Sequence, residues 1–225
     1  MSARLNPRPL ARVPEPAVPH SRTPRAERKK LRILDAAAEV VARRGYAGAT
    51  LAEIAAEAGT QAGSIYYHFE SREALIEEVM RHGVGLSFAH TRACVERLPR
   101  SASPRTRLET AIRAHLEMML AESGNARATS RLTGQIPPEM WQRVNAVMRA
   151  YGAYLDRLIA AAAAAGEIDP AIDRSAFRML VIGAANWVPE WFRPNGRSSP
   201  GQLCDLLVRM AMEGVATRRR SRAAA

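Results

Sequence analysis

Cysteine is scarce in this chain, and long apolar runs are absent. The 225 residues include two cysteines, Cys94 and Cys204, whose separation fits no metal-binding or redox motif. No apolar run approaches the roughly 18 residues that span a bilayer, and the N-terminus lacks the apolar core of a secretory signal. These absences predict a cytoplasmic protein with two reduced thiols, no metal and no membrane segment.

Residue patterns that carry enzyme chemistry are also missing. No Ser/His/Asp arrangement, glycine-rich phosphate loop, HExxH motif or carboxylate pair is evident. His68 has no second ligand or nucleophile at a suitable spacing, and His82, His90 and His115 are scattered like ordinary helix residues. The sequence therefore predicts a protein that is not an enzyme and needs no cofactor. A small all-α hydrolase or isomerase is the alternative, which any measured turnover would revive.

Positive charge is concentrated at the two ends of the chain. The net charge is +11, and residues 1–32 hold nine Lys/Arg against Glu15 and Glu27. Four arginines follow residue 217, whereas residues 33–217 hold equal numbers of Arg and acidic residues. Basic arms usually bind a polyanion, most often a nucleic acid. The alternative is that these ends serve only solubility.

The pattern after the basic N-terminus is helical almost throughout. Residues 1–24 include six prolines and few apolar residues, which predicts a disordered arm. From Arg25 onward apolar residues recur at helical spacing and no segment alternates like a strand, so we expect an all-α fold. We expect one helical unit over 25–80, a second over 81–217 and a basic tail over 218–225.

Capping residues and glycines predict where the helices begin and end. Gly45 should close the first helix, and Thr50 with Glu53 forms a capping box that opens a short second helix. A third helix is expected over 61–69, followed by a fourth that Ser71 caps. Later helix starts are expected at Ser103-Pro104, Pro137-Pro138, Asp173 and the Ser199–Gln202 capping box, with Gly166 ending the helix that begins at Pro138.

The stretch TQAGSIYYHF, residues 60–69, completes a helix-turn-helix pattern with the short helix before it. Four features of the surrounding segment 25–80 are distinctive. They are a G-Y before the Thr-capped helix, the turn I-A-x-x-A-G, the helix S-I-Y-Y-H-F and the next helix start S-R-E-A-L. With these features the segment closely resembles the TetR family of transcriptional regulators.

That resemblance implies a homodimer that binds a palindromic operator in double-stranded DNA. Residues 25–80 would be its reading head, and 81–217 its effector-binding and dimerisation domain. The Gln61 amide can form two hydrogen bonds with an adenine edge, and Gly63, which has no side chain, lets the duplex come close to the protein backbone. Ile65 and Phe69 should be core residues. The expected DNA contacts are Thr50, Gln61, Ala62, Gly63, Ser64, Tyr66, Tyr67, His68 and Arg72, joined by Arg28, Lys29 and Lys30.

The reading segment itself is unusual in carrying no Lys or Arg. Residues 50–69 contain Glu53 and Glu57, so their formal charge is negative. Attraction to phosphates must then come from hydroxyls, backbone N–H groups and basic residues outside the segment. Those residues are Arg72 and the group Arg25, Arg28, Lys29, Lys30 and Arg32.

The segment NWVPEWFRPNGRSSPGQLCDLLVRMAMEGV is similar to the W-x-x-x-W-[FY]-R-P-x-G-x-x-[ST]-P pattern of one TetR branch. Several members of that branch respond to acyl-CoA thioesters in fatty-acid or steroid catabolism. The similarity implies a repressor that a small hydrophobic effector, such as an acyl-CoA, releases from its operator. A regulator of efflux or other metabolism that responds to a drug-like hydrophobic ligand is the alternative.

Aromatic and Met side chains of the second half are candidate pocket linings, with plain core as the alternative. The candidates are Met119, Trp141, Met148, Tyr151 and Trp187. A CoA ligand would also need arginines at the pocket mouth, for which we consider Arg127, Arg131 and Arg193. Ala211 and Gly214 on the last helix are small enough for a partner helix to approach.

Overall fold

The computed structural model describes residues 25–121 and 124–215, and throughout this part the secondary structure is helical. The helices are α1 (Arg25–Gly48), α2 (Leu51–Glu57), α3 (Ala62–Tyr66), α4 (Arg72–Glu96), α5 (Pro104–Leu120), α6 (Gly124–Leu132), α7 (Pro138–Ala164), α8 (Arg174–Trp191) and α9 (Pro200–Gly214). The all-α prediction is confirmed. The expected arm 1–24 and tail 218–225 lie outside the described residues. None of the described helices has both the length and the apolar character that a membrane crossing requires.

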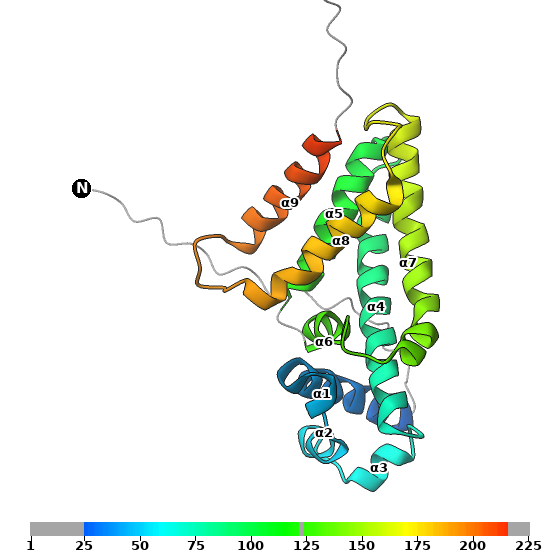
Figure 1. Cartoon of the computed structure of the whole chain (residues 1–225), viewed down its shortest axis with the longest axis vertical. Coiled ribbons are helices and arrows are strands. Elements are labelled where there is room, and N and C mark those ends of the chain that lie inside the picture. Colours follow the sequence, from blue (N-terminus) through cyan, green and yellow to red (C-terminus); the bar gives the residue numbers. More distant parts are fainter. Residues whose placement is uncertain (1–24, 122–123, 216–225) are drawn as a thin grey trace, which may run out of the picture.

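The reading head occupies one end of the molecule, with α3 at its tip (Figure 1). Ile54 of α2 and Ile65 of α3 are fully buried in one apolar cluster with Leu34 of α1 and Ile76 of α4. Phe69, just after α3, belongs to the same cluster. The predicted core roles of Ile65 and Phe69 are therefore confirmed, and these side chains hold the short α3 in place.

The core of the reading head continues into the second half of the chain. Leu132 of α6 and Val144 of α7 belong to the same buried cluster as the reading-head residues. α6 packs closely along α1, and the Tyr46 N–H donates to Gln135 Oε1 at 3.0 Å. α4 also runs without a break past residue 80, where the sequence suggested a domain boundary. The two halves are thus joined by a shared core as well as by the chain.

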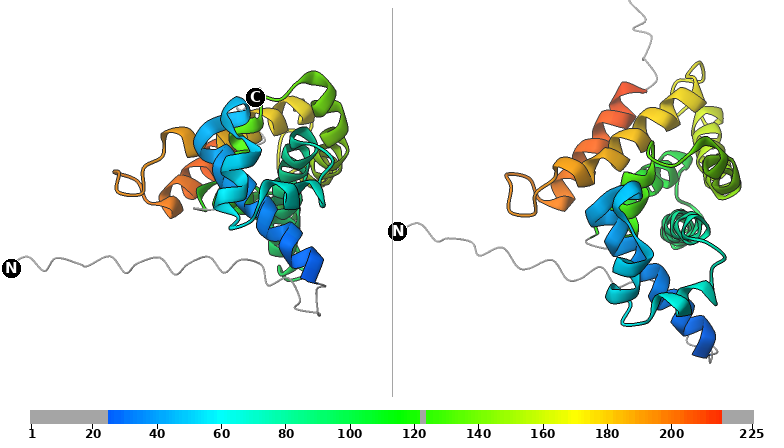
Figure 2. Two further views of the ribbon diagram at one scale, coloured as in Figure 1. Left: turned by 90° about the horizontal axis from the view of Figure 1, so that it is seen from below. Right: turned by 60° about the horizontal axis from the view of Figure 1, so that its bottom comes forward.

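The second half is a bundle in which α5 and α8 lie between α7 on one flank and α9 on the other (Figures 1 and 2). Three further apolar clusters fill it, centred on α5. One of them packs Leu116 and Met119 with residues of α8 and α9, and another packs Tyr151 and Leu155 with α4. This bundle carries the residues that the sequence suggested for effector binding.

Most of the predicted helix ends are confirmed. The side chains of Ser71, Ser103, Asp173 and Ser199 each accept a backbone N–H at the start of a helix, and the reciprocal Gln202 bond completes the last capping box. Gly45 and Gly166 adopt positive φ angles of 72° and 68°. Glycine tolerates that conformation better than other residues, which explains why helical geometry is interrupted at Gly45 and α7 ends just before Gly166.

Two local predictions need correction, and one helix was not predicted. The Thr50 hydroxyl accepts the Glu53 N–H at 3.2 Å, but the Glu53 carboxylate pairs with Arg44 at 3.3 Å instead of completing the capping box. α3 ends at Tyr66, three residues before the predicted end, because the chain turns there to bury Phe69. α6 was not predicted, since its buried side chains are mostly small: Gly124, Ala126, Ala128, Thr129 and Leu132.

Candidate nucleic-acid interface and effector domain

The outer side of α3 presents polar and aromatic side chains to solvent. Gln61, Ala62 and Gly63 are exposed, and 58% of Tyr66 and 83% of Tyr67 are accessible. Gln61 precedes the helix but forms no side-chain cap, so its amide is not occupied at the helix end. Exposed aromatic rings beside a polar amide are typical of a surface that binds a partner. The predicted reading residues therefore lie together on one accessible surface.

Gly63 is not required by the packing of the free chain. A Cβ atom built at this position meets nothing within 4 Å, and its φ angle lies outside the left-handed region. The missing side chain therefore leaves open space beside α3 that another molecule can enter. This supports the sequence-based interpretation that Gly63 lets a duplex approach the backbone.

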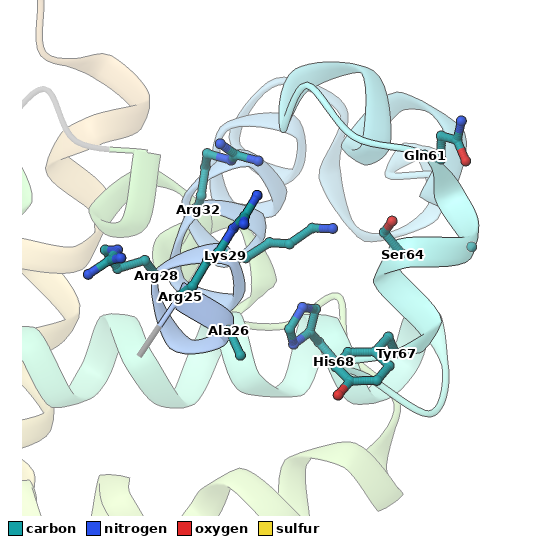
Figure 3. Close-up of a pocket in the computed structure, with 10 residues that line it drawn as sticks. Arg25, Ala26, Arg28, Lys29, Arg32, Gln61, Ser64, Tyr67 and His68 are labelled. Carbon is teal, nitrogen blue, oxygen red and sulfur yellow. The ribbon is translucent and has the colours of Figure 1, made fainter. Parts of the chain in front are cut away.

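An open groove of about 1090 Å³ separates the start of α1 from α3 (Figure 3). Its α3 side consists of Gln61, Gly63, Ser64, Tyr67 and His68, and its α1 side of Arg25, Ala26, Arg28, Lys29 and Arg32. Among the residues that the structure describes, no acidic one lines this groove. In Figure 3 the Lys29 side chain extends toward α3, whereas Arg28 points the other way. The basic residues expected in an arm thus form the first two turns of a helix, and Lys29 among them extends toward the α3 side of the groove.

Lys30 departs from the predicted set of phosphate contacts. Its Nζ lies 4.0 Å from Glu78 Oε1 and 5.6 Å from the centre of the Phe69 ring, and it does not line the groove. Because α1 is helical here, Lys30 points away from the face that carries Lys29. The structure corrects the prediction: Lys30 helps to pack α1 against α4.

Arg72 also serves the fold rather than the interface. Its Nε donates to the Ala49 carbonyl at 2.6 Å, another guanidinium N–H donates to the Tyr46 carbonyl, and the group stacks 4.8 Å from the Tyr46 ring. Its remaining terminal nitrogen lies 3.0 Å from Glu73. These contacts clamp the loop before α2 to the start of α4. The expectation that Arg72 faces phosphate is therefore corrected. Thr50, at the end of the same loop, stays exposed.

The predicted effector residues separate into two groups. Met119 and Tyr151 are buried and Met148 is half-buried, all within the bundle clusters or against them. Trp141 is 36% exposed and Trp187 is 64% exposed. The two tryptophans lie on the surface of the chain, so their prediction as linings of an enclosed pocket is corrected. Helical spacing alone could not show which side of each helix the bundle covers.

Two of the three arginines expected at a pocket mouth make tertiary contacts, and the third makes local ones. Arg127 on α6 pairs with Glu39 of α1 at 3.0 Å. Arg131 donates to the Arg43 carbonyl at 3.4 Å and lies 3.9 Å from Glu190 of α8, while Arg193 donates to carbonyls of its own turn. Arg127 and Arg131 therefore connect the effector domain to the reading head.

A chain of buried polar side chains crosses the bundle, and the sequence did not reveal it. Tyr151 Oη lies 2.8 Å from Thr91 Oγ1 and 3.0 Å from His115 Nδ1, and His115 Nε2 lies 3.0 Å from Asn186 Oδ1. Burial lowers the pKa of His115 to about 4, although its bond to Asn186 opposes the shift. Burial also raises the pKa of Tyr151. Both groups are therefore neutral near pH 7, and no spacing rule would have singled out His115.

α8 and α9 carry large apolar side chains that no part of residues 25–121 and 124–215 covers. These exposed side chains are Met179, Leu180, Trp187, Trp191, Leu206 and Met210. A monomer seldom leaves so many large apolar groups in water unless they bind a partner. Of the two small residues expected at a partner helix, Gly214 is exposed and Ala211 is buried within the chain's own core.

Comparison with known proteins matches both halves of the chain. Residues 33–79 match the profile of "Bacterial regulatory proteins, tetR family", and residues 101–215 match "Tetracyclin repressor-like, C-terminal domain". The chain is 23% identical over 188 residues to the fatty acid metabolism regulator protein of Bacillus subtilis, covering 83% of this chain and 95% of that protein. It is 26% identical over 192 residues to the transcriptional repressor KstR2 of Rhodococcus jostii, covering 84% and 92%.

A solved structure gives a similar match. It contains AibR in complex with isovaleryl coenzyme A and operator DNA, and it superposes with a TM-score of 0.72 at 25% identity. The match covers 82% of this chain and 98% of AibR. Since the alignment extends over nearly all of that protein, it includes both the reading head and the bundle.

Proposed function

The chain belongs to the TetR family of bacterial regulatory proteins, and from this premise we propose that it is a repressor released from its operator by an acyl-CoA thioester. It is a DNA-binding transcriptional regulator and not an enzyme. Within it we assign residues 25–80 to DNA reading and 81–217 to effector binding and dimerisation. We place its action in the cytoplasm, where bacterial DNA lies.

The observation that carries the DNA-binding proposal is the groove between α1 and α3. Four basic side chains line one wall, and the exposed residues of α3 line the other. A phosphate backbone seated against α1 would bring α3 alongside the base edges, where Gln61 can pair with adenine through two hydrogen bonds. The acidic residues of the second helix, Glu53 and Glu57, do not face this groove because they pair with Arg44 and Arg43.

The exposed apolar surface of α8 and α9 supports a homodimer. A two-fold axis through this surface would place two reading heads on one face of a duplex. Such a dimer binds a palindromic operator whose half-sites are separated by about one helical turn or a multiple of it. A footprint that covers a single asymmetric half-site would contradict this arrangement.

The acyl-CoA proposal rests on the relatives together with the composition of the bundle. The relatives include a fatty acid metabolism regulator, and AibR was crystallised with an acyl-CoA and operator DNA. The bundle offers Met119, Met148 and Tyr151 among apolar clusters, and methionine side chains adapt readily to a ligand. Release of the operator requires that the ligand bind the conformation that cannot bind DNA more tightly than the conformation that can, by at least a few kcal/mol. A neutral drug-like ligand in the same bundle is the rival proposal.

The test begins with operator fragments that the purified chain selects from random duplex DNA. Fluorescence anisotropy then follows release of a labelled operator as acyl-CoAs of different chain length, and the matching free acids, are titrated. We expect thioesters to release the DNA at concentrations where free acids do not. Equal release by free acids would contradict the CoA proposal, and release by neutral drugs alone would support its rival.

A further inference from the structure

Four side chains from four helices form a single hydrogen-bonded chain inside the bundle. Thr91 of α4 meets Tyr151 of α7 at 2.8 Å, Tyr151 meets His115 of α5 at 3.0 Å, and His115 meets Asn186 of α8 at 3.0 Å. Thr91, Tyr151 and His115 are at most 6% exposed. The chain lies between two apolar clusters, and it links polar groups of four helices across this largely hydrophobic interior.

The direction of the hydrogen bonds follows from the acceptor at one end. Asn186 Oδ1 accepts from His115, so the proton of the neutral ring resides on Nε2 and Nδ1 is an acceptor. Nδ1 then accepts the Tyr151 O–H, and the Tyr151 oxygen accepts the Thr91 O–H. Burial keeps His115 uncharged near pH 7, with its pKa lowered to about 4.

Thr91 is therefore the terminal donor of this chain. If the Tyr151 hydroxyl donated elsewhere, Nδ1 of His115 would lose its hydrogen-bond donor. If the His115 ring rotated, Asn186 Oδ1 would lose the donor that it now has. Turning the Thr91 hydrogen removes only one bond to the Tyr151 oxygen, which still donates to His115. Among the four side chains, Thr91 has the hydroxyl that can serve a new acceptor at the smallest cost.

Two partly buried side chains flank this hydroxyl on α4 and α7, although Thr91 itself is fully buried. Phe88 lies one turn before Thr91 on α4, and Met148 lies one turn before Tyr151 on α7, and both are only partly buried. The Phe88 and Tyr151 rings are stacked with centroids 5.2 Å apart. An apolar ligand that displaces the Phe88 and Met148 side chains would place the polar group at its inner end beside Thr91.

We propose that the Thr91 hydroxyl, oriented by Tyr151, His115 and Asn186, is the recognition point for a neutral carbonyl oxygen of the effector. The proposal rests on the effector role of the bundle and specifies the chemistry that the bundle selects. The hydrogen-bonding groups of the chain are neutral, so a carboxylate placed there would be buried without an opposite charge, at a large desolvation cost. A thioester, ester or amide carbonyl needs one donor and brings no charge. The bundle therefore discriminates against free acids.

The test compares ligand pairs that differ only in the carbonyl oxygen. Each acyl-CoA thioester is paired with the alkyl-CoA thioether of equal length, and each fatty acid methyl ester with the corresponding methyl ether. For wild type we expect the carbonyl-bearing member of a pair to release operator DNA at about tenfold lower concentration. Thr91→Val keeps the side-chain shape without the hydroxyl, and we expect it to reduce this ratio to about one.

Ser87→Ala is the matched control. Ser87 is also buried on α4, one turn before Thr91, but its hydroxyl donates to the Gly83 carbonyl of its own helix at 3.2 Å. This variant should keep the wild-type ratio. Thermal unfolding of both variants checks that neither loses its fold.

The outcomes separate this inference from the CoA proposal. If only the ester pair releases DNA, and in a Thr91-dependent way, the CoA proposal is wrong and the inference stands. If thioesters release DNA but Thr91→Val keeps the wild-type ratio, the inference is overturned and the CoA proposal stands. A ratio that Ser87→Ala abolishes equally, or release by no pair at all, also overturns the inference.

Discussion

The reading head and the effector domain use their polar side chains in opposite ways. In the reading head Gln61, Ser64 and Tyr67 follow one another within a few residues and face an open groove. In the effector domain Thr91, His115, Tyr151 and Asn186 come from four helices and are largely enclosed. A duplex is large and rigid, so it is read from an exposed surface, whereas a small effector is recognised by being surrounded.

The contrast in exposure does not make the two regions independent. Leu132 and Val144 lie in the core of the reading head, and Arg143 of α7 pairs with Glu77 of α4 at 2.6 Å. Arg127 and Arg131 add polar contacts from α6 to α1 and α8. A change of packing in the bundle therefore alters the same core that positions α3.

The largest expected effect comes from the basic wall of the groove. Replacing Arg25, Lys29 and Arg32 together by alanine should weaken binding to all DNA sequences by about two to three orders of magnitude at 0.1 M salt. The slope of log affinity against log salt should become shallower by up to about 3, because three phosphate contacts are lost. Filter binding over a range of salt concentrations measures both quantities.

Lys30→Ala is the control for each single charge of the basic wall, because it removes one positive charge of α1 from a residue that faces Glu78 and Phe69. We expect Lys30→Ala to keep nearly the wild-type salt slope. An unchanged slope in the triple variant would show that the wall does not contact phosphate.

The second effect tests the enclosed character of the effector domain. His115 titrates with a pKa of about 4 in the folded chain instead of 6.5, so the unfolded chain binds a proton first as the pH falls. Stability should be full above about pH 6.5 and should decrease toward pH 4, by on the order of 3 kcal/mol from this residue. Urea unfolding of wild type and His115→Gln across this range measures the difference. If the free energy of unfolding depended on pH in the same way for wild type and His115→Gln, the lowered pKa of His115 would be contradicted.

Two glycines sharpen the comparison further. Gly63→Leu should leave the unfolding temperature nearly unchanged, because the site is open in the free chain. Operator affinity should nevertheless fall roughly 100-fold as the side chain holds α3 away from the bases, whose contacts are worth about 1–3 kcal/mol each.

Gly83→Ala should behave in the reverse way, since a Cβ there collides with the Thr129 hydroxyl of α6. We expect it to lower the free energy of unfolding by about 1–3 kcal/mol. Calorimetry and operator titration on both variants provide the check, and a strongly destabilised Gly63→Leu would refute the distinction.

The smallest effect concerns sequence preference. Gln61→Ala should cost about 1–3 kcal/mol on the selected operator and nothing on operators changed at the one base pair that Gln61 reads. Binding measured on a panel of single-base operator variants tests this. A uniform loss across the panel would assign Gln61 to the phosphate backbone instead.

Local sequence patterns predicted much of this fold. Ser71, Ser103 and Ser199 marked helix starts correctly because a cap involves residues only a few positions apart. α6 escaped prediction, since small residues such as Ala126 and Ala128 do not form a recognisable apolar stripe. The sequence predicted α3 to end at Phe69, three residues too late. Phe69 continues the helical spacing of apolar residues, but it reaches the core through a turn after the helix has ended.

The sequence by itself determined the all-α class and the helix-turn-helix, because these depend on neighbours within a few residues, while the DNA contacts of its exposed residues stay a prediction. Only the tertiary structure decided that Arg72 and Lys30 support the fold, that Trp187 lies on the surface, and that Thr91, Tyr151 and His115 form one chain. The partners of these side chains are mostly distant in sequence or set by the face on which each helix packs. Periodicity shows that a helix has an apolar face, but it does not specify which other helix covers that face.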